Sequence, residues 1–131
     1  MTTLTGHAEA ISVRYDTSQV NLSELLLIFF NTHDPTTLNR QGNDIGTQYR
    51  SGIYFTDIEQ KETVKVVINQ LINENAFKAK IITEIKDATT FYEAEKNHHD
   101  YYNRNKEQPY CVFTINPKIE KIKKYFSRNL N

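Results

Sequence analysis

Several residue types are scarce in this chain of 131 residues, and each scarcity excludes a class of protein. A single cysteine, Cys111, excludes an internal disulfide and is typical of a reducing compartment. The 16 basic and 16 acidic side chains cancel, so the basic excess that nucleic-acid-binding proteins use against phosphates is lacking. No apolar run approaches the length of a membrane span, and no signal-peptide pattern opens the sequence. We therefore expect a soluble, cytoplasmic protein that binds neither nucleic acid nor membrane.

Glycine and proline are also rare, with four and three copies, and none of them marks a domain boundary. A chain of this length is the size of one domain, and its folding can bury about two-thirds of the unfolded surface. We therefore predict a single domain over residues 1–131.

Two hydrophobic periodicities alternate along the chain. Alternation of apolar and polar residues predicts strands over 10–15, 49–55, 80–85 and 111–115. Helical spacing predicts helices over 22–30, 57–72 and 91–102, and another after the Asn116-Pro117 pair. Asn21 with Glu24, and Asp57 with Gln60, have the spacing of helix N-caps. This order predicts a sheet with helices packed on it, in the α/β or α+β range, and leaves the strand order open.

The polar segment over residues 33–48 follows neither periodicity. Connections of this length in small domains are usually functional or disordered. The segment has neither a charge excess nor low complexity, so we expect it to contribute to a site.

Ionisable groups lie near predicted strand starts and in loops. Glu9 opens the first strand before an apolar pair, where a half-buried carboxyl would keep its proton near neutral pH and act as a general acid. The alternative, which residue types alone favour, is an exposed glutamate at a strand edge. Metal-ligand spacings such as His-x-x-Glu-His are absent, and Cys111 has the setting of a small buried hydrophobic residue. The other candidates are His7, His33, Asp34, Asp44, Tyr49, His98, His99, Asp100 and Tyr110.

From Thr5-Gly6-His7-Ala8-Glu9-Ala10 onward, the chain resembles the peptide methionine sulfoxide reductase A family. The resemblance continues through His33-Asp34-Pro35-Thr36 and residues 38–51 (Leu-Asn-Arg-Gln-Gly-Asn-Asp-Ile-Gly-Thr-Gln-Tyr-Arg-Ser), and the run from His33 to Ser51 is highly specific. It also includes residues 83–85 (Thr-Glu-Ile), Phe91-Tyr92, and 108–111 (Gln-Pro-Tyr-Cys). Nearly the whole chain takes part, so chance similarity is excluded.

The resemblance implies an α+β fold: a mixed sheet with helices packed on it, as a two-layer α/β sandwich. It implies reduction of methionine S-sulfoxide, free or in proteins, by a cysteine thiolate. It places the acid on Glu9, the groups that bind the oxygen and water on Asp44 and Tyr49, and a further pocket residue on Tyr110. We accordingly expect Glu9 to be buried beside Asp44 and Tyr49. Cys111 would be a possible recycling thiol, no metal or cofactor would be bound, and thioredoxin or dithiothreitol would be the external reductant.

The chain departs from the family pattern in two places. The Gly-Cys-Phe-Trp motif that carries the nucleophile is missing, and no tryptophan occurs anywhere. The chain therefore resembles a C-terminal portion, expected to be inactive alone and to self-associate through an exposed sheet edge. Residues 112–115 (Val-Phe-Thr-Ile) replace the glycine-rich tail in which many members carry recycling cysteines. A non-catalytic remnant or binding module that keeps the sulfoxide-recognition half is the alternative, and a metal-dependent hydrolase is a distant third.

Overall fold

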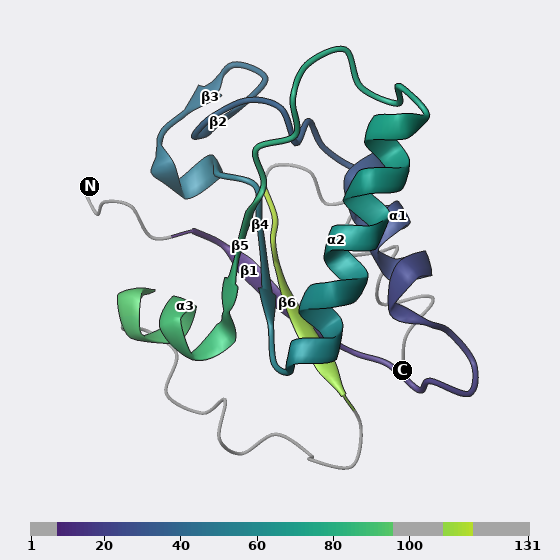
Figure 1. Cartoon of the computed structure of the whole chain (residues 1–131). Helices are drawn as coiled ribbons and strands as arrows, with labels where there is room; N and C mark the ends of the chain where they lie inside the picture. Colours follow the sequence, from purple (N-terminus) through teal and green to yellow (C-terminus); the bar gives the residue numbers. More distant parts are fainter. Residues whose placement is uncertain (1–7, 96–108, 117–131) are drawn as a thin grey trace.

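The computed structural model describes residues 8–95 and 109–116 (Figure 1). His7, His98, His99, Asp100, the end of the helix predicted over 91–102 and the helix expected after Pro117 lie outside the described residues. The elements are, in order, β1 (Ala10–Arg14), α1 (Leu22–Asn31), β2 (Arg40–Gln41), β3 (Asp44–Ile45), the 3-10 turn η1 (Thr47–Tyr49), β4 (Gly52–Phe55), α2 (Ile58–Asn73), β5 (Glu84–Asp87), α3 (Ala88–Glu95) and β6 (Tyr110–Thr114).

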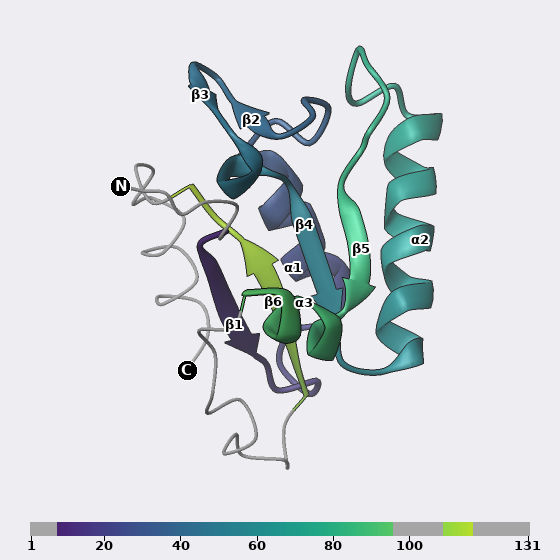
Figure 2. The ribbon, with the colours of Figure 1, turned by 90° about the vertical axis from the view of Figure 1, so that its left-hand side faces the viewer.

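Four strands form a mixed sheet in the order β1-β6-β4-β5 (Figure 2). The strand β6 pairs antiparallel with β1 and β4, whereas β4 and β5 run parallel. The strand β6, the last one among the described residues, therefore lies between β1 and β4 in the sheet. The predicted α+β fold with a mixed sheet is confirmed.

Helices cover both faces of this sheet. α1 and α2 lie on one face, and the short α3 lies on the other (Figure 1), so the described residues add a helix on the second face of the two-layer sandwich that was expected. Alternation along the strands supplies both interfaces: Ile53 and Phe113 belong to the core under α1 and α2, whereas Tyr54 and Val112 pack with Phe91 of α3. No helix among the described residues is long and apolar enough to cross a membrane.

Local sequence signals explain where the two long helices begin. The Asn21 side chain accepts from the Glu24 backbone and the Glu24 carboxylate accepts from the Asn21 backbone, which completes the predicted capping box. Asp57 caps α2 in the same way, by accepting from the backbone N–H of Gln60. The Gln60 side chain does not cap the helix in return, as Glu24 does in α1. Its amide instead donates to the Tyr15 hydroxyl and to the Tyr110 carbonyl.

The strand expected after α2 and the polar segment over 33–48 both differ from their predictions. The strand expected over 80–85 begins only at Glu84, since the N–H of Ile82 donates to the Pro35 carbonyl and ties that segment to the polar loop. The polar segment over 33–48 contains the hairpin β2–β3, in which Gln41 pairs with Asp44. Gly42 has a φ of 59° at its turn, a left-handed conformation that glycine adopts without strain. The polar segment therefore contains regular hydrogen-bonded structure.

Candidate active site

One end of the four-stranded sheet collects the polar groups singled out in the sequence. Beyond the β1–β6 ladder, the N–H of Ile115 donates to the Glu9 carbonyl at 2.9 Å. The next residue, Asn116, donates its side-chain amide to the Asp44 carboxylate at 3.1 Å. Both views show the hairpin β2–β3 and the turn η1 near the start of β1 (Figures 1 and 2). Glu9 and Asp44 therefore flank the same end of β6.

The hairpin that carries Asp44 is fixed to the end of α1. The Gln41 side chain is buried and clamps Asp34, accepting from its N–H at 3.0 Å and donating to its carbonyl at 2.6 Å. The N–H of Gly46 donates to the Asn39 carbonyl at 2.8 Å and closes the hairpin at its other end. Asp44 thus lies on a hairpin with defined anchors on both sides.

Tyr49 ends the turn η1 and is half-buried. The turn is held from outside by Arg50, whose guanidinium donates to the Thr47 carbonyl at 3.0 Å and to Glu84 at 3.3 Å. Tyr54 also donates its hydroxyl to Glu84, at 2.7 Å. A Cβ at Gly52 would lie 2.4 Å from that hydroxyl, so a glycine is required there. This network holds the turn on which Tyr49 lies.

The Glu84 carboxyl is charged in this network. Burial acts to raise its pKa, but the hydrogen bonds from Tyr54 and Lys86 and the charges of Lys86 and Arg50 outweigh it, so the pKa is lowered. Glu84 is therefore a structural anion, held between two cations, and is not poised as an acid.

His33 ties the polar loop to the sheet. One ring nitrogen bonds to the Phe29 carbonyl at 2.7 Å and the other to the Ser51 hydroxyl at 2.7 Å. The Ser51 hydroxyl also bonds to Thr83 at 2.8 Å. Burial lowers the pKa of His33 to about 4, although the Phe29 carbonyl and the charge of Asp34 favour protonation. His33 is therefore a neutral structural link.

The depressed pKa of His33 predicts a pH-dependent stability. The unfolded chain takes up a proton on this imidazole below about pH 6.5, whereas the folded chain does so only near pH 4. The contribution of the neutral His33 to the free energy of unfolding is therefore fully present above about pH 6.5 and is lost as the pH falls toward 4. Urea unfolding should show a loss of about 2 kcal/mol between about pH 7.5 and pH 5. The variant His33→Gln, which cannot titrate, should lose that dependence; an unchanged dependence would assign it to other groups.

Two expectations for the site need correction. Glu9 is exposed, so the expectation of a buried carboxyl is wrong. Alternation buries the neighbouring Ala8 against Tyr54 and Val112, and it directs Glu9 to the opposite face, at the end of the strand where water reaches it. Tyr110 is not brought to Asp44: it pairs with Arg14 at the far end of β6, about 17 Å along the strand from Glu9.

Cys111 lies next to Tyr110 at that far end and is fully buried. Its thiol donates to the Tyr54 carbonyl at 3.5 Å. Burial raises the pKa of Cys111 to about 12. The Val112 backbone hydrogen bond acts to lower this pKa, and the charge of Asp57 acts to raise it further. The thiol is therefore protonated at neutral pH.

Burial predicts that Cys111 reacts only through unfolding. Labelling of the native chain by an aromatic disulfide reagent should be slower than that of free cysteine by about three orders of magnitude or more. The labelling rate should rise with urea in parallel with unfolding followed by circular dichroism. Fast labelling in the absence of denaturant would contradict the prediction and would reopen a recycling role.

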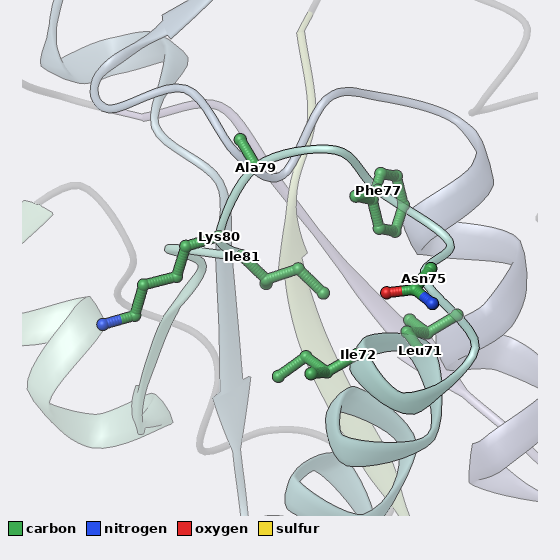
Figure 3. A pocket seen from close by; sticks show the side chains of 7 residues that line it. All are labelled: Leu71, Ile72, Asn75, Phe77, Ala79, Lys80 and Ile81. Carbon is green, nitrogen blue, oxygen red and sulfur yellow. The ribbon is translucent and has the colours of Figure 1, made fainter.

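A hollow of about 230 Å³ lies elsewhere, between the end of α2 and the segment that follows it (Figure 3). Apolar side chains dominate its lining, to which Asn75 and Lys80 add the polar groups. None of the residues that line it carries a carboxylate or a thiol, so we do not assign the reaction to it. Among the described residues, no group of three or more His, Cys, Asp or Glu side chains could hold a metal ion.

Sequence reasoning missed one residue of this end of the sheet. Asn116 is buried and bonds Asp44, although the Asn116-Pro117 pair was interpreted only as the opening of a helix. The available signal was an amide immediately after an apolar strand, where a buried polar side chain needs a partner.

The model of the family described as peptide methionine sulfoxide reductase matches residues 1–130. The chain belongs to this family. A peptide methionine sulfoxide reductase from Trichodesmium erythraeum is 53% identical over 93% of this chain and 69% of its own length. One from Deinococcus radiodurans is 48% identical over 96% of this chain and 61% of its own. The solved methionine sulfoxide reductase A of Corynebacterium diphtheriae is 26% identical, with a TM-score of 0.44 and coverage of 88% and 48%.

Membership of the peptide methionine sulfoxide reductase family assigns the chain to the oxidoreductases. The residues that carried the resemblance, from His33 to Ser51, form the anchored hairpin and the turn beside Glu9 and Asn116.

Proposed function

We propose that this end of the sheet is the acid- and oxide-binding half of a peptide-methionine (S)-S-oxide reductase site, which serves the repair of oxidised methionine. The single observation that carries the proposal is the pairing of Glu9 with Ile115 and of Asp44 with Asn116 on consecutive residues of one strand end. Family membership supplies the substrate, and this geometry supports the roles of the residues.

The reaction requires a proton as well as a nucleophile. A thiolate attacks the sulfoxide sulfur and forms a sulfur–sulfur bond while the sulfur–oxygen bond breaks and the oxygen, after taking up two protons, leaves as water. A water molecule then attacks the cysteine sulfur, the sulfur–sulfur bond breaks, and a proton is released, so the cysteine becomes a sulfenic acid and the substrate leaves as methionine. In the proposal Glu9 provides a proton to the leaving oxygen, and Asp44 with Tyr49 orients the oxygen and a water molecule. A bound substrate that covers Glu9 would favour its neutral form.

The thiolate is proposed to come from outside these 131 residues. Cys111 is the one cysteine of the sequence, and its burial at the far end of β6 makes it unsuitable. A dithiol such as thioredoxin, or dithiothreitol in the assay, would reduce the sulfenic acid, forming its own disulfide and water. No metal or bound cofactor takes part. A cytoplasmic location, indicated by the lone cysteine, belongs to the same proposal.

The buried thiol also favours a second candidate, a binding module that recognises sulfoxide without reducing it. Titration of the chain with N-acetylmethionine S-sulfoxide amide, followed by amide chemical shifts, tests both. Under the first proposal, binding occurs, Asp44→Ala weakens it, and a polypeptide with the Gly-Cys-Phe-Trp motif brings turnover with dithiothreitol. Binding without turnover on that addition favours the module. Equal responses to the sulfoxide and to N-acetylmethionine amide would contradict both.

A further inference from the structure

A buried asparagine reaches Asp44 from the end of the central strand β6. Asn116 is 5% exposed, and its amide nitrogen lies 3.1 Å from a carboxylate oxygen of Asp44. A carboxylate only accepts hydrogen bonds, so the amide must present its N–H₂ group to it. A buried amide at this place therefore has an electrostatic partner, and a hydrogen bond to a charged group is stronger than one between neutral groups.

We propose that Asn116 is a positioning residue for the oxide-binding carboxylate of Asp44. The proposal rests on the proposed function, because it gives a role in sulfoxide recognition to a residue that acts only through Asp44.

The topology explains why such a residue is needed. Asp44 lies on a two-stranded hairpin whose ladder is separate from the four-stranded sheet that leads to Glu9. A two-stranded hairpin is at best marginally stable alone. Gln41 anchors one strand of the hairpin to Asp34, and Asn116 connects the other strand to β6. Since the N–H of Ile115 donates to the Glu9 backbone carbonyl, consecutive residues of one chain segment contact the backbone of Glu9 and the carboxylate of Asp44.

The bond also fixes how the Asp44 carboxylate is turned. A carboxylate rotates readily about its last single bond. Holding one oxygen at Asn116 sets the direction of the other oxygen, and pre-set orientation is what a site for a small polar ligand requires. Loss of the amide should therefore weaken recognition of the sulfoxide while the fold remains.

The test measures the affinity of the whole chain for N-acetylmethionine S-sulfoxide amide by amide chemical shifts. Asn116→Ala should weaken binding about fivefold, whereas Asn73→Ala, at the exposed end of α2, should leave it unchanged. In the Asp44→Ala background, Asn116→Ala should have no further effect. An unchanged affinity in Asn116→Ala, or an equal loss in both backgrounds, would overturn the positioning role.

Asn116→Asp keeps the shape of the side chain and removes the donor, so it separates positioning from packing. Two carboxylates this close repel each other, and a proton taken up at lower pH and shared between them would restore a hydrogen bond. We compare the affinity of Asn116→Asp for the sulfoxide with that of the unsubstituted chain at each pH. This ratio should be low at about pH 7.5 and should partly recover at about pH 5. A ratio that does not change with pH contradicts the proposal. Division removes the pH dependence that the two chains share.

Two further outcomes decide the proposal. If Asn116→Ala fails to fold, as its amide spectrum would show, Asn116→Ser takes its place in the same comparison, with a smaller loss expected because the hydroxyl is still a donor. If the unsubstituted chain does not bind the sulfoxide, the proposed function and this role fall together. If that chain binds and Asn116→Ala binds equally well, only the positioning role falls.

Discussion

The 131-residue chain incubated with methionine S-sulfoxide and excess dithiothreitol should show no turnover above that of its Cys111→Ser variant. The reaction needs a thiolate at the sulfoxide, and the one thiol present is fully buried with a pKa raised to about 12. Burial therefore keeps the Cys111 thiol in its protonated form at pH 7. General acid catalysis contributes about 10²- to 10⁴-fold and cannot replace the covalent step.

The position of Cys111 reinforces this expectation. It pairs with Val13, next to the last pair at one end of the β1–β6 ladder, whereas Glu9 and Asp44 lie beyond the other end of that ladder. Turnover above the Cys111→Ser control would show that the thiol leaves the core and would make Cys111 the nucleophile. Activity that appears on adding a polypeptide with the Gly-Cys-Phe-Trp motif, in both variants alike, would support the divided site.

Replacing Phe29 by alanine should destabilise the chain by about 3–5 kcal/mol. The ring is fully buried at the centre of the core, with centroids 5.0 Å from Phe113 and 5.5 Å from Phe30. It also packs against the His33 imidazole at 4.2 Å, so the cavity would adjoin the link that holds the polar loop. Since domains of this size are stable by about 5–15 kcal/mol, a large part of the total would be lost.

Leu27→Ala is the matched control for Phe29→Ala, because it removes a side chain that is 41% exposed from the same helix. Its cost should stay below about 1 kcal/mol. Urea unfolding followed by circular dichroism measures both variants, and similar costs for the two would show that Phe29 is not central to the core.

Local features of the sequence were predictable because their physical causes lie within a few residues. The capping box at Asn21 and Glu24, the cap at Asp57 and the apolar stripes of α1 and α2 each depend on neighbours three or four positions away. The boundaries of β5 were less predictable, because a contact between Ile82 and the distant Pro35 delays the strand.

The burial of Glu9 was predicted wrongly for a related reason. A glutamate before an apolar strand can face either side of the sheet, and which side is covered depends on helices far along the chain. The structure places Ala8 under the α3 side of the sheet and leaves Glu9 exposed.

By itself, the sequence determined the family, the two long helices, the approximate positions of the strands of the main sheet, and the importance of the segment over 33–48. Its motifs and periodicities are local, and local patterns can be recognised without knowing what packs on them. Only the tertiary structure decided that β6 inserts between β1 and β4 and that Asn116 bonds Asp44 across 72 positions of sequence. These contacts join segments far apart in the chain, and no propensity or spacing encodes such pairings because packing alone brings them together.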